Sequence, residues 1–372
     1  MARASDIVVV GAGVIGCTVA YELARRGASV EVVDERVIGM GATQASAGML
    51  APYVEAREDN PLFDLAVRSL DLFEEFVARV SSESGITVSY QRTGTLDVAT
   101  DENEMRALEL AADLLSRRGV RQELIDGAAA RLAEPHLSTD VVGGLLIPAH
   151  GFVSAVDLTR AVAEAARRHG ATFLERNRVK RIARENGNAA VETDRGRLQS
   201  GAVVLAAGSW SGAIEIAGPE KRLPVRPVRG QLLHLTWSGS PLRRIIWSRK
   251  CYLVPWDDGT VLVGATSEEA GFDERATVAG VRDLLEAACE VAPHAWRAGF
   301  EGARVGLRPA TSDDLPIIGF SRAVPHLMYA TGHYRSGVLL APLTARLVAD
   351  AMLDDRIDPI LEAVGPARFG EF

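Results

Sequence analysis

The sequence has few cysteines, few aromatic residues and no excess of positive charge. Its three cysteines, Cys17, Cys251 and Cys289, fit neither a disulfide framework nor the spacing of zinc ligands, so a reducing compartment, the cytoplasm, is expected and no metal site is predicted. Lysine and arginine total 41 against 49 aspartates and glutamates, for a net charge of −8. This balance argues against nucleic acid and against an anionic membrane surface as partners.

The chain also lacks a long apolar run. The best candidate, residues 7–21, is too short and too rich in glycine to span a bilayer. Asp6 directly precedes it and no small-residue cleavage site follows before Glu22, which argues against a signal peptide. What is present is a length of 372 residues, 47% hydrophobic residues and 35 glycines, a composition typical of an α/β globule of about two domains.

The N-terminal residues carry a dinucleotide-binding fingerprint. A β-branched strand over residues 6–10 leads into Gly11-Ala-Gly13-Val-Ile-Gly16, a helical pattern runs to Gly27, and a second strand ends at Asp34. In this pattern the glycines permit a tight turn, close approach of a pyrophosphate and packing of the helix on the strand. The helix N-terminus would then carry the diphosphate charge.

An acid after the second strand is expected to bind the ribose of the nucleotide. Asp34 is the predicted residue, and Glu35 is a rival whose side chain should point to the opposite side of the strand end. An acid here disfavours a 2′-phosphate, so NADP is the least expected dinucleotide. Residues 39–50 are small or hydroxylated where an NAD-binding fold would start another helix, which favours FAD; a glycine-rich surface loop is the alternative.

The middle of the chain alternates between helical and strand patterns. Helices are predicted over residues 61–80 and 102–119, and from an N-cap at Asp157 to His169. A buried strand pattern over 202–205 ends at Gly208, where the chain is expected to pass close to a cofactor. Three strands typical of an antiparallel sheet are predicted over residues 226–236, 251–255 and 261–264, the last two joined by a hairpin turn.

These patterns predict an α/β fold: a Rossmann-like FAD-binding domain with an inserted α+β substrate domain built on a mostly antiparallel sheet. The predicted FAD-binding domain comprises residues 1–85, 145–220 and 305–372. The predicted substrate domain comprises residues 86–144 and 221–304.

The C-terminal region combines an arginine with a glycine-bounded helix start. Arg308 is followed by Pro309, and a strand over 327–330 leads through Gly332 and Gly337 into a helix over 338–352. A helix N-terminus preceded by glycines binds anions, and at the pyrimidine edge of a flavin it would stabilise the negative charge that develops there.

Together these blocks resemble the glycine oxidases of thiamine biosynthesis, within the D-amino-acid oxidase and sarcosine oxidase superfamily. The resemblance covers nearly the whole chain, and its most specific part is Gly332-His-Tyr-Arg335-Ser-Gly337-Val-Leu-Leu-Ala-Pro342. It implies that Arg308 binds the substrate carboxylate, that Tyr252 closes over the substrate, and that Arg335 lies at the substrate end. These three are the candidate catalytic residues, and Met49 joins them as a candidate substrate-binding residue.

The candidate FAD contacts come from two sources. The fingerprint and the glycine turns indicate Gly11, Gly13, Gly16, Asp34, Glu35, Gly48 and Gly208. The resemblance adds Val14, Ile15, Ala42, Thr43, Ala47, Met49, Val179, His333, Tyr334, Arg335, Ser336, Gly337, Val338 and Leu339.

Each chemical role has a structural alternative. Arg308 suits a carboxylate because its guanidinium makes two parallel charge-assisted bonds, although it would equally serve a structural salt bridge. Tyr252 is alternatively a core aromatic, and for His333 a ring packed at a turn is favoured over an acid–base role. Lys250 stands where bacillary relatives have histidine, which puts substrate preference in question. Sarcosine oxidases of the resembling superfamily attach flavin through a cysteine in the region that corresponds to the segment after Arg308. No cysteine follows Arg308 here, so the resemblance implies a noncovalent FAD.

The predicted activity is oxidation of glycine, sarcosine or short D-amino acids by hydride transfer to FAD, with oxygen reduced to hydrogen peroxide. Arg308 and Tyr252 would orient the substrate, so no catalytic base is needed. An amino-acid dehydrogenase that passes electrons to a quinone or carrier would share these motifs. An FAD-dependent domain acting on modified RNA is disfavoured by the acidic balance. The resemblance implies a homo-oligomer, specifically a tetramer.

Overall fold

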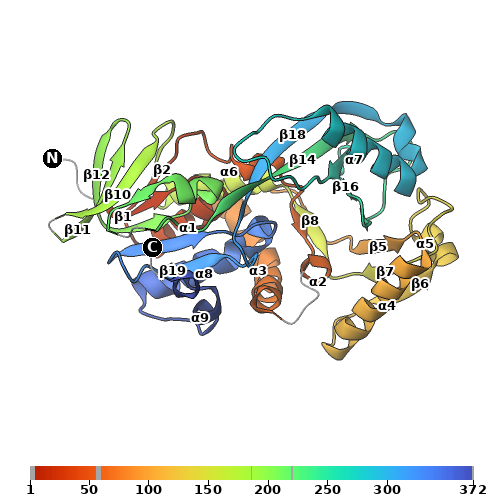
Figure 1. Cartoon of the computed structure of the whole chain (residues 1–372), viewed down its shortest axis with the longest axis horizontal. Helices are drawn as coiled ribbons and strands as arrows, with labels where there is room; N and C mark the ends of the chain where they lie inside the picture. The colour runs from red at the N-terminus through yellow and green to blue at the C-terminus, as the bar shows by residue number, and fades with distance from the viewer. Residues whose placement is uncertain (1–4, 56–59, 186, 219–220, 371–372) are drawn as a thin grey trace.

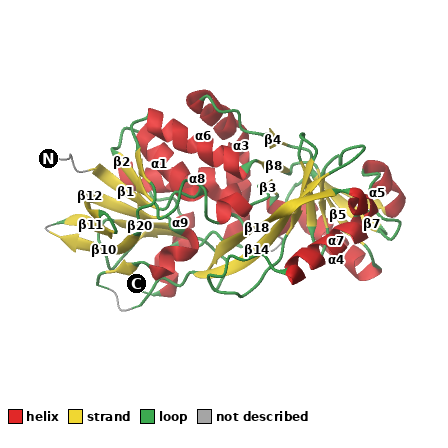
Figure 2. Cartoon of the chain, turned by 90° about the horizontal axis from the view of Figure 1, so that it is seen from above, coloured by secondary structure: helices red, strands yellow, loops and turns green. Residues whose placement is uncertain are grey.

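The computed structural model describes residues 5–55, 60–185, 187–218 and 221–370. Two large sheets lie toward opposite ends of an elongated molecule, with a small sheet between them (Figure 2). The small sheet has the order β3-β8-β4 and is built from β3 (Met49–Leu50), β4 (Tyr90–Gln91) and β8 (Gly151–Val153).

The first sheet has a parallel centre. Its parallel strands are β9 (Thr172–Leu174), β2 (Val30–Val33), β1 (Ser5–Val10), β12 (Gly196–Leu205) and β20 (Leu327–Thr331), paired in this order. Because helices and loops cover both faces of this centre, residues 7–10 of β1 and all of β20 are buried. Antiparallel extensions come from β10 (Val179–Glu185), β11 (Asn188–Thr193) and β19 (Ile317–Phe320), and β13 (Glu215–Ile216) pairs parallel with β10.

Four long helices pack on one another beside this sheet and bury its largest hydrophobic core (Figure 2). They are α1 (Val14–Arg25), α3 (Pro61–Ser84), α6 (Ala155–Arg168) and α8 (Gly337–Leu353). Smaller elements are α2 (Pro52–Glu55), α9 (Ile360–Val364) and the 3-10 turns η1 (Ala42–Ala45), η2 (Gly208–Ala213), η3 (Pro293–Arg297) and η4 (Pro366–Phe369).

The second sheet is antiparallel except for one pair. Its order is β18-β14-β17-β16-β15-β5-β7-β6, and only β15 and β5 run parallel among its pairs. The strands are β5 (Thr95–Ala99), β6 (Glu123–Asp126), β7 (Gly143–Ile147), β14 (Arg226–Thr236), β15 (Ile245–Trp247), β16 (Tyr252–Pro255), β17 (Thr260–Gly264) and β18 (Gly299–Ala310). Three helices pack against this sheet (Figure 1): α4 (Glu102–Arg117), α5 (Gly127–Ala133) and α7 (Val278–Val291).

The predicted fold class is confirmed, and one local prediction is wrong. The helix predicted to be capped by Asp157 begins earlier, because the Ser154 hydroxyl accepts the Asp157 N–H at 3.2 Å and so caps α6. Asp157 lies in the first turn of α6, where its negative charge interacts favourably with the positive end of the helix dipole.

The division into domains stays a prediction. β7 and β18 each run across one predicted boundary, at residues 144 and 304. The boundary at residue 220 falls outside the described residues. In the part of the chain that the structure describes, no helix has the length and hydropathy needed to cross a membrane.

Candidate active site

A cavity of about 610 Å³ lies between the two large sheets and is lined by residues of both. One wall is made by the carboxyl ends of β1, β2, β12 and β20, and the other by β14, β16, β17 and β18. In open α/β sheets ligands bind outside the carboxyl ends of the strands, so this is the expected place for a dinucleotide.

Two glycines of the N-terminal loop, Gly11 and Gly16, leave no room for side chains. Gly11 has a φ of +111°, and a Cβ there would lie 2.4 Å from the Ala206 carbonyl oxygen. A Cβ on Gly16 would lie 1.9 Å from the Gly11 carbonyl oxygen, so Gly16 serves helix packing. Gly13 lines the cavity at the start of α1, beside Thr43, whose hydroxyl accepts the Val14 N–H at 3.1 Å. This loop and helix start fit a diphosphate.

The two candidate ribose acids are held differently. Asp34 accepts hydrogen bonds from the N–H groups of Ala12 at 2.6 Å and Arg36 at 2.7 Å, which fix its carboxylate at the cavity wall. Burial raises the pKa of Asp34, and these two N–H groups oppose the rise. Glu35 also lines the cavity, but it is exposed and lies 3.8 Å from Arg178. The more constrained Asp34 is the better-positioned acceptor.

Most of the candidate FAD contacts lie on this one cavity. Gly48 lines it with a φ of +68°, and a Cβ there would lie 1.7 Å from the Val153 carbonyl oxygen. Gly16, Ser336 and Leu339 are not among the described residues that line the cavity. The others do line it: Gly11, Gly13, Val14, Ile15, Asp34, Glu35, Ala42, Thr43, Ala47, Gly48, Met49, Val179, Gly208, His333, Tyr334, Arg335, Gly337 and Val338.

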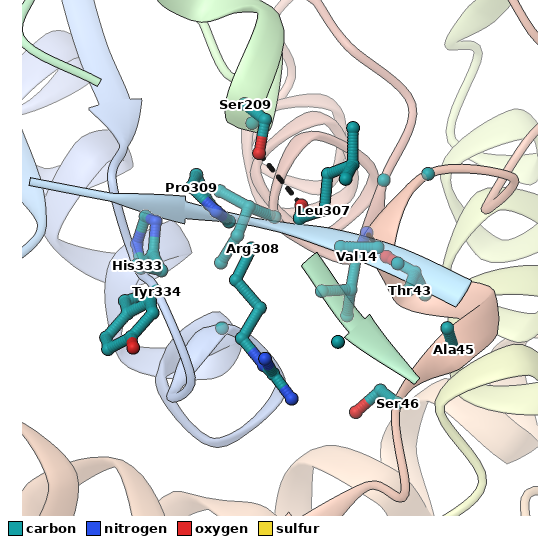
Figure 3. Close-up of a pocket in the computed structure, with 18 of the residues that line it drawn as sticks. Val14, Thr43, Ala45, Ser46, Ser209, Leu307, Arg308, Pro309, His333 and Tyr334 are labelled. Atoms are coloured by element: carbon teal, nitrogen blue, oxygen red, sulfur yellow. Dashed lines mark hydrogen bonds between the residues drawn. The ribbon is translucent and has the colours of Figure 1, made fainter. Parts of the chain in front are cut away.

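Arg308 reaches into the cavity from β18. Its guanidinium points into the space between Tyr334 and Ser46 (Figure 3), and Nη1 donates to the Thr266 carbonyl oxygen at 3.0 Å. Among the described residues, no carboxylate forms an ion pair with it. An unpaired guanidinium inside a cavity favours capture of an anionic ligand over a structural salt bridge.

Gly230 on β14 makes room for this arginine. A Cβ at Gly230 would lie 2.4 Å from Nη2 of Arg308. The side chain can move, so a larger residue would displace the guanidinium rather than prevent folding. Sequence reasoning missed Gly230, because only the pairing of β14 with β18 brings the two residues together.

We expect Gly230→Ala to weaken substrate binding by displacing Arg308. The KM for a carboxylate substrate should rise by about tenfold, equivalent to about 1.4 kcal/mol. The thermal midpoint should change little. Steady-state kinetics and a thermal scan check this, with Gly299→Ala on the paired strand as the control, since a Cβ there meets no atom closer than 3.6 Å. An unchanged KM would remove Gly230 from the site.

Tyr252 is held between two neighbouring strands. On β15 its cross-strand partner is Trp247, whose ring centroid lies 5.5 Å away, and on β17 its partner is Gly264. A Cβ at Gly264 would lie 2.3 Å from the Tyr252 hydroxyl, so the phenol lies directly over this glycine. Tyr252 is half-buried and lines the cavity, as do Met49 and the exposed Arg335. The structure therefore brings together the four candidate substrate residues.

Other lining residues were not singled out from sequence. Trp247, Arg249 and Thr266 line the substrate side, and Arg36 and Lys180 the nucleotide side. Trp247, Arg249, Arg36 and Lys180 carry no sequence motif, and only their position next to a strand end or hairpin would have pointed to them. Lys250, left open by the sequence, lines the cavity with its ammonium paired to Glu290 at 2.5 Å.

His333 is a buried, neutral histidine. Its Nε2 lies 3.0 Å from the Thr344 hydroxyl, and burial lowers its pKa to about 3. This supports a packing role at the cavity wall. His150, stacked on Tyr53, likewise has its pKa lowered to about 3 by burial.

These buried histidines should make stability fall in acid. Between pH 6.5 and about pH 3, each of these histidines is protonated in the unfolded chain but stays neutral in the folded chain. Each should therefore lower the free energy of unfolding by about 1.4 kcal/mol per pH unit across that window. In denaturant titrations, the free energy of unfolding of His333→Asn should fall between pH 7 and pH 5 by about 2 kcal/mol less than that of the parent protein. His326→Asn, at an exposed histidine, is the control; equal losses in both variants would contradict a neutral His333.

The chain belongs to the family of FAD dependent oxidoreductases (DAO), whose sequence pattern matches residues 6–351. It is therefore an FAD-dependent enzyme. The glycine loop that excludes side chains, the helix start beside Thr43 and the cavity between the sheets fit FAD, and Asp34, Thr43 and Gly48 are among the residues that would hold it.

Within this family the chain is similar to glycine oxidases. It is 34% identical to glycine oxidase of Geobacillus kaustophilus, over 94% of this chain and 93% of the relative. The crystal structure of that enzyme superposes with a TM-score of 0.93, covering 100% of this chain and 99% of that one.

Two other similarities bear on function. The chain is 33% identical, over 99% of its length, to the bifunctional protein ThiO/ThiG of Synechocystis, but spans 55% of that relative. The chain thus spans about half the length of the curated relatives it matches first. The structure of L-proline dehydrogenase from P. horikoshii superposes with a TM-score of 0.85 at 26% identity, covering 100% of both chains.

Proposed function

We propose that this enzyme oxidises glycine and other small amines, including sarcosine and short D-amino acids, and uses oxygen as the electron acceptor to give hydrogen peroxide. The observation that carries the proposal is Arg308, an unpaired guanidinium among the described residues of the FAD cavity. The similarity to glycine oxidase of Geobacillus kaustophilus supports the substrate class.

The proposed mechanism depends on orientation. Arg308 binds the carboxylate through its guanidinium, while Tyr252, held over Gly264, covers the substrate from the second sheet. Met49 and Arg335 complete the substrate end of the cavity. Together these residues fix the position of the Cα hydrogen and exclude water from it.

The lining residues also support hydride transfer without a catalytic base. Among the described residues of the cavity, the carboxylates are Asp34 and Glu35 at the nucleotide side, and His333 is buried and neutral. Among the described lining residues, no carboxylate lies at the substrate end to remove a proton from Cα. When bound, FAD supplies the hydride acceptor and passes the electrons on; the imine product then hydrolyses in water.

The proposal is tested with the purified, FAD-loaded protein. Its visible spectrum is recorded, and then peroxide release under air is measured for glycine, sarcosine, D-alanine and D-proline. Glycine or sarcosine should give peroxide in proportion to amine consumed. A flavoprotein that turns over none of the four would overturn the substrate assignment.

A dehydrogenase that reduces a quinone or carrier is the second candidate. The similarity to the L-proline dehydrogenase structure favours it, since that fold covers this whole chain. The two candidates differ in the oxidant: the oxidase turns over under air alone, whereas the dehydrogenase requires an added quinone and releases little peroxide.

The proposal also covers the cellular compartment of the enzyme, the attachment of FAD and the oligomeric state. All three cysteines, Cys17, Cys251 and Cys289, are free thiols, which supports a reducing compartment such as the cytoplasm. A noncovalent FAD and a homotetramer follow from the resemblance to glycine oxidases. Sedimentation of the purified protein and release of FAD on denaturation test these two points.

A further inference from the structure

A loop of the second sheet crosses to the nucleotide side of the cavity. This loop, residues 268–275 and here called the strap, lies between β17 and α7. Its base is fixed to β14, because Glu268 and Arg229 exchange two backbone hydrogen bonds and Nη2 of Arg229 lies 2.6 Å from the Glu268 carboxylate. The Arg229 side chain is 8% exposed and also pairs with Asp273 at 3.1 Å. The strap is therefore anchored on its own sheet.

The far part of the strap contacts the FAD-binding side. Glu274 and Arg36 form a two-pronged ion pair, with N–O distances of 2.9 and 2.6 Å. The Arg36 guanidinium lies over the Trp210 ring, 4.4 Å from its centroid, and Phe272 lies against the same ring with centroids 5.8 Å apart. Two strap residues and two residues that follow strands of the first sheet, Arg36 after β2 and Trp210 in η2, thus form one cluster, here called the latch: Arg36, Trp210, Phe272 and Glu274.

The latch lies beside the nucleotide half of the cavity. Arg36 follows Asp34 and Glu35 directly in sequence, and Arg36 and Trp210 both line the cavity. Trp210 also lies 3.8 Å from the position of a Cβ on Gly41, another lining residue. Phe272 and Glu274 are not among the described lining residues. They hold the wall of the cavity in place without themselves facing its interior.

We propose that the latch is a gate for FAD: the strap holds Arg36 and Trp210 in place at the nucleotide side of the cavity, and the Glu274–Arg36 and Phe272–Trp210 contacts must break for these two wall residues to move aside and the cofactor to enter or leave. A noncovalent FAD would be retained in part by this barrier. Because Glu274 and Phe272 do not face the cavity, their loss removes the barrier without removing a wall contact to the cofactor. A gate of this kind changes both the entry and the exit rate.

The test measures FAD exchange with the whole protein. Release is followed as the rise in flavin fluorescence after dilution of the FAD-loaded protein, and uptake as its quenching when FAD is added to the apoprotein. Glu274→Gln should accelerate both rates by about threefold to tenfold at low ionic strength, a range that matches a partly exposed bidentate pair. The difference should shrink in 1 M salt, since screening weakens the pair in the parent protein. Phe272→Ala should accelerate both rates without this salt dependence.

Matched controls lie on the same elements. Glu269→Gln makes the same charge change in the strap, but Glu269 pairs with Arg226 on β14 and leaves the latch intact. Phe300→Ala removes an aromatic ring of similar exposure, 53% against 50% for Phe272, from β18. Both controls should exchange FAD at the parent rate.

Two outcomes would overturn the gate. One is exchange at the parent rate in both latch variants. The other is faster release with unchanged uptake, which would mean that Glu274 acts by positioning Arg36 on the nucleotide. The measurement uses no amine, so it stays informative whichever substrate or electron acceptor the enzyme uses. A latch variant that does not fold takes up no FAD. In that case the exchange rates of the other latch variant test the gate.

Discussion

Replacing Arg308 with leucine is expected to lower kcat/KM for glycine by roughly thirtyfold to a few thousandfold while FAD stays bound. The range corresponds to about 2 to 5 kcal/mol, the usual loss when one partner of a buried charge pair is removed. Leucine keeps the apolar stem but removes the hydrogen bond to Thr266 and the fork that faces the cavity. Arg308→Lys should recover part of the loss, because it restores the charge but not the two parallel bonds.

Arg304→Leu is the matched control for this experiment. Arg304 lies on the same strand, donates to the Gln44 carbonyl oxygen at 3.1 Å and is not among the described lining residues. It should change kcat/KM by less than about threefold, within the spread of surface substitutions. Steady-state kinetics on glycine, together with the flavin spectrum of each variant, separate substrate binding from cofactor loss. If Arg308→Leu retained parental kinetics, Arg308 would not be the carboxylate site.

Gly11→Ala is expected to abolish FAD binding and to destabilise the fold by more than about 3 kcal/mol. Two costs combine at this position. A positive φ disfavours any L side chain by about 1 to 2 kcal/mol, and here a Cβ would lie 2.4 Å from the Ala206 carbonyl oxygen and 3.0 Å from Cα of Ala207. Both neighbours are backbone of the segment after β12, so relief requires moving a strand of the central sheet.

Gly27→Ala separates the two costs. Gly27 follows the same helix, α1, and has a similarly positive φ of +96°, but a Cβ there meets nothing within 4 Å. It should cost about 1 kcal/mol and leave FAD bound. Denaturant titration and flavin content of the purified variants are the measurements. Equal effects of the two substitutions would show that the approach of Ala206 is unimportant.

Local patterns were enough to predict the parts of the fold that are short-range in sequence. The glycine loop with its flanking strands, and β14 with its observed bounds, follow from apolar periodicity and glycine placement. The cap of α6 shows the limit: serine and aspartate both suit an N-cap, and only the observed bond from the Asp157 N–H to Ser154 decides between them.

Site residues could be predicted where they belong to a sequence motif. They could not be predicted where their role depends on a contact with a residue from another strand or loop. Arg308 and Tyr252 were singled out because they stand in recognisable blocks. Gly230 and the latch residue Glu274 were not, since each acquires its role from a partner far away in sequence: Arg308 and Arg36. Such partnerships depend on strand register and loop path, which a single sequence does not specify.

The parallel pairing of β20 with β12 determines when during synthesis the site can form. Val203 pairs with Leu327, and β20 leads directly into α8, whose first residues line the cavity. The ribosome delivers the N-terminal glycine loop first, but the wall that contains His333 and Gly337 emerges only after the intervening chain has been made. FAD capture must therefore wait until synthesis has passed Gly337. A nascent chain stalled before Leu327 should not retain the cofactor, although it already carries the entire glycine fingerprint.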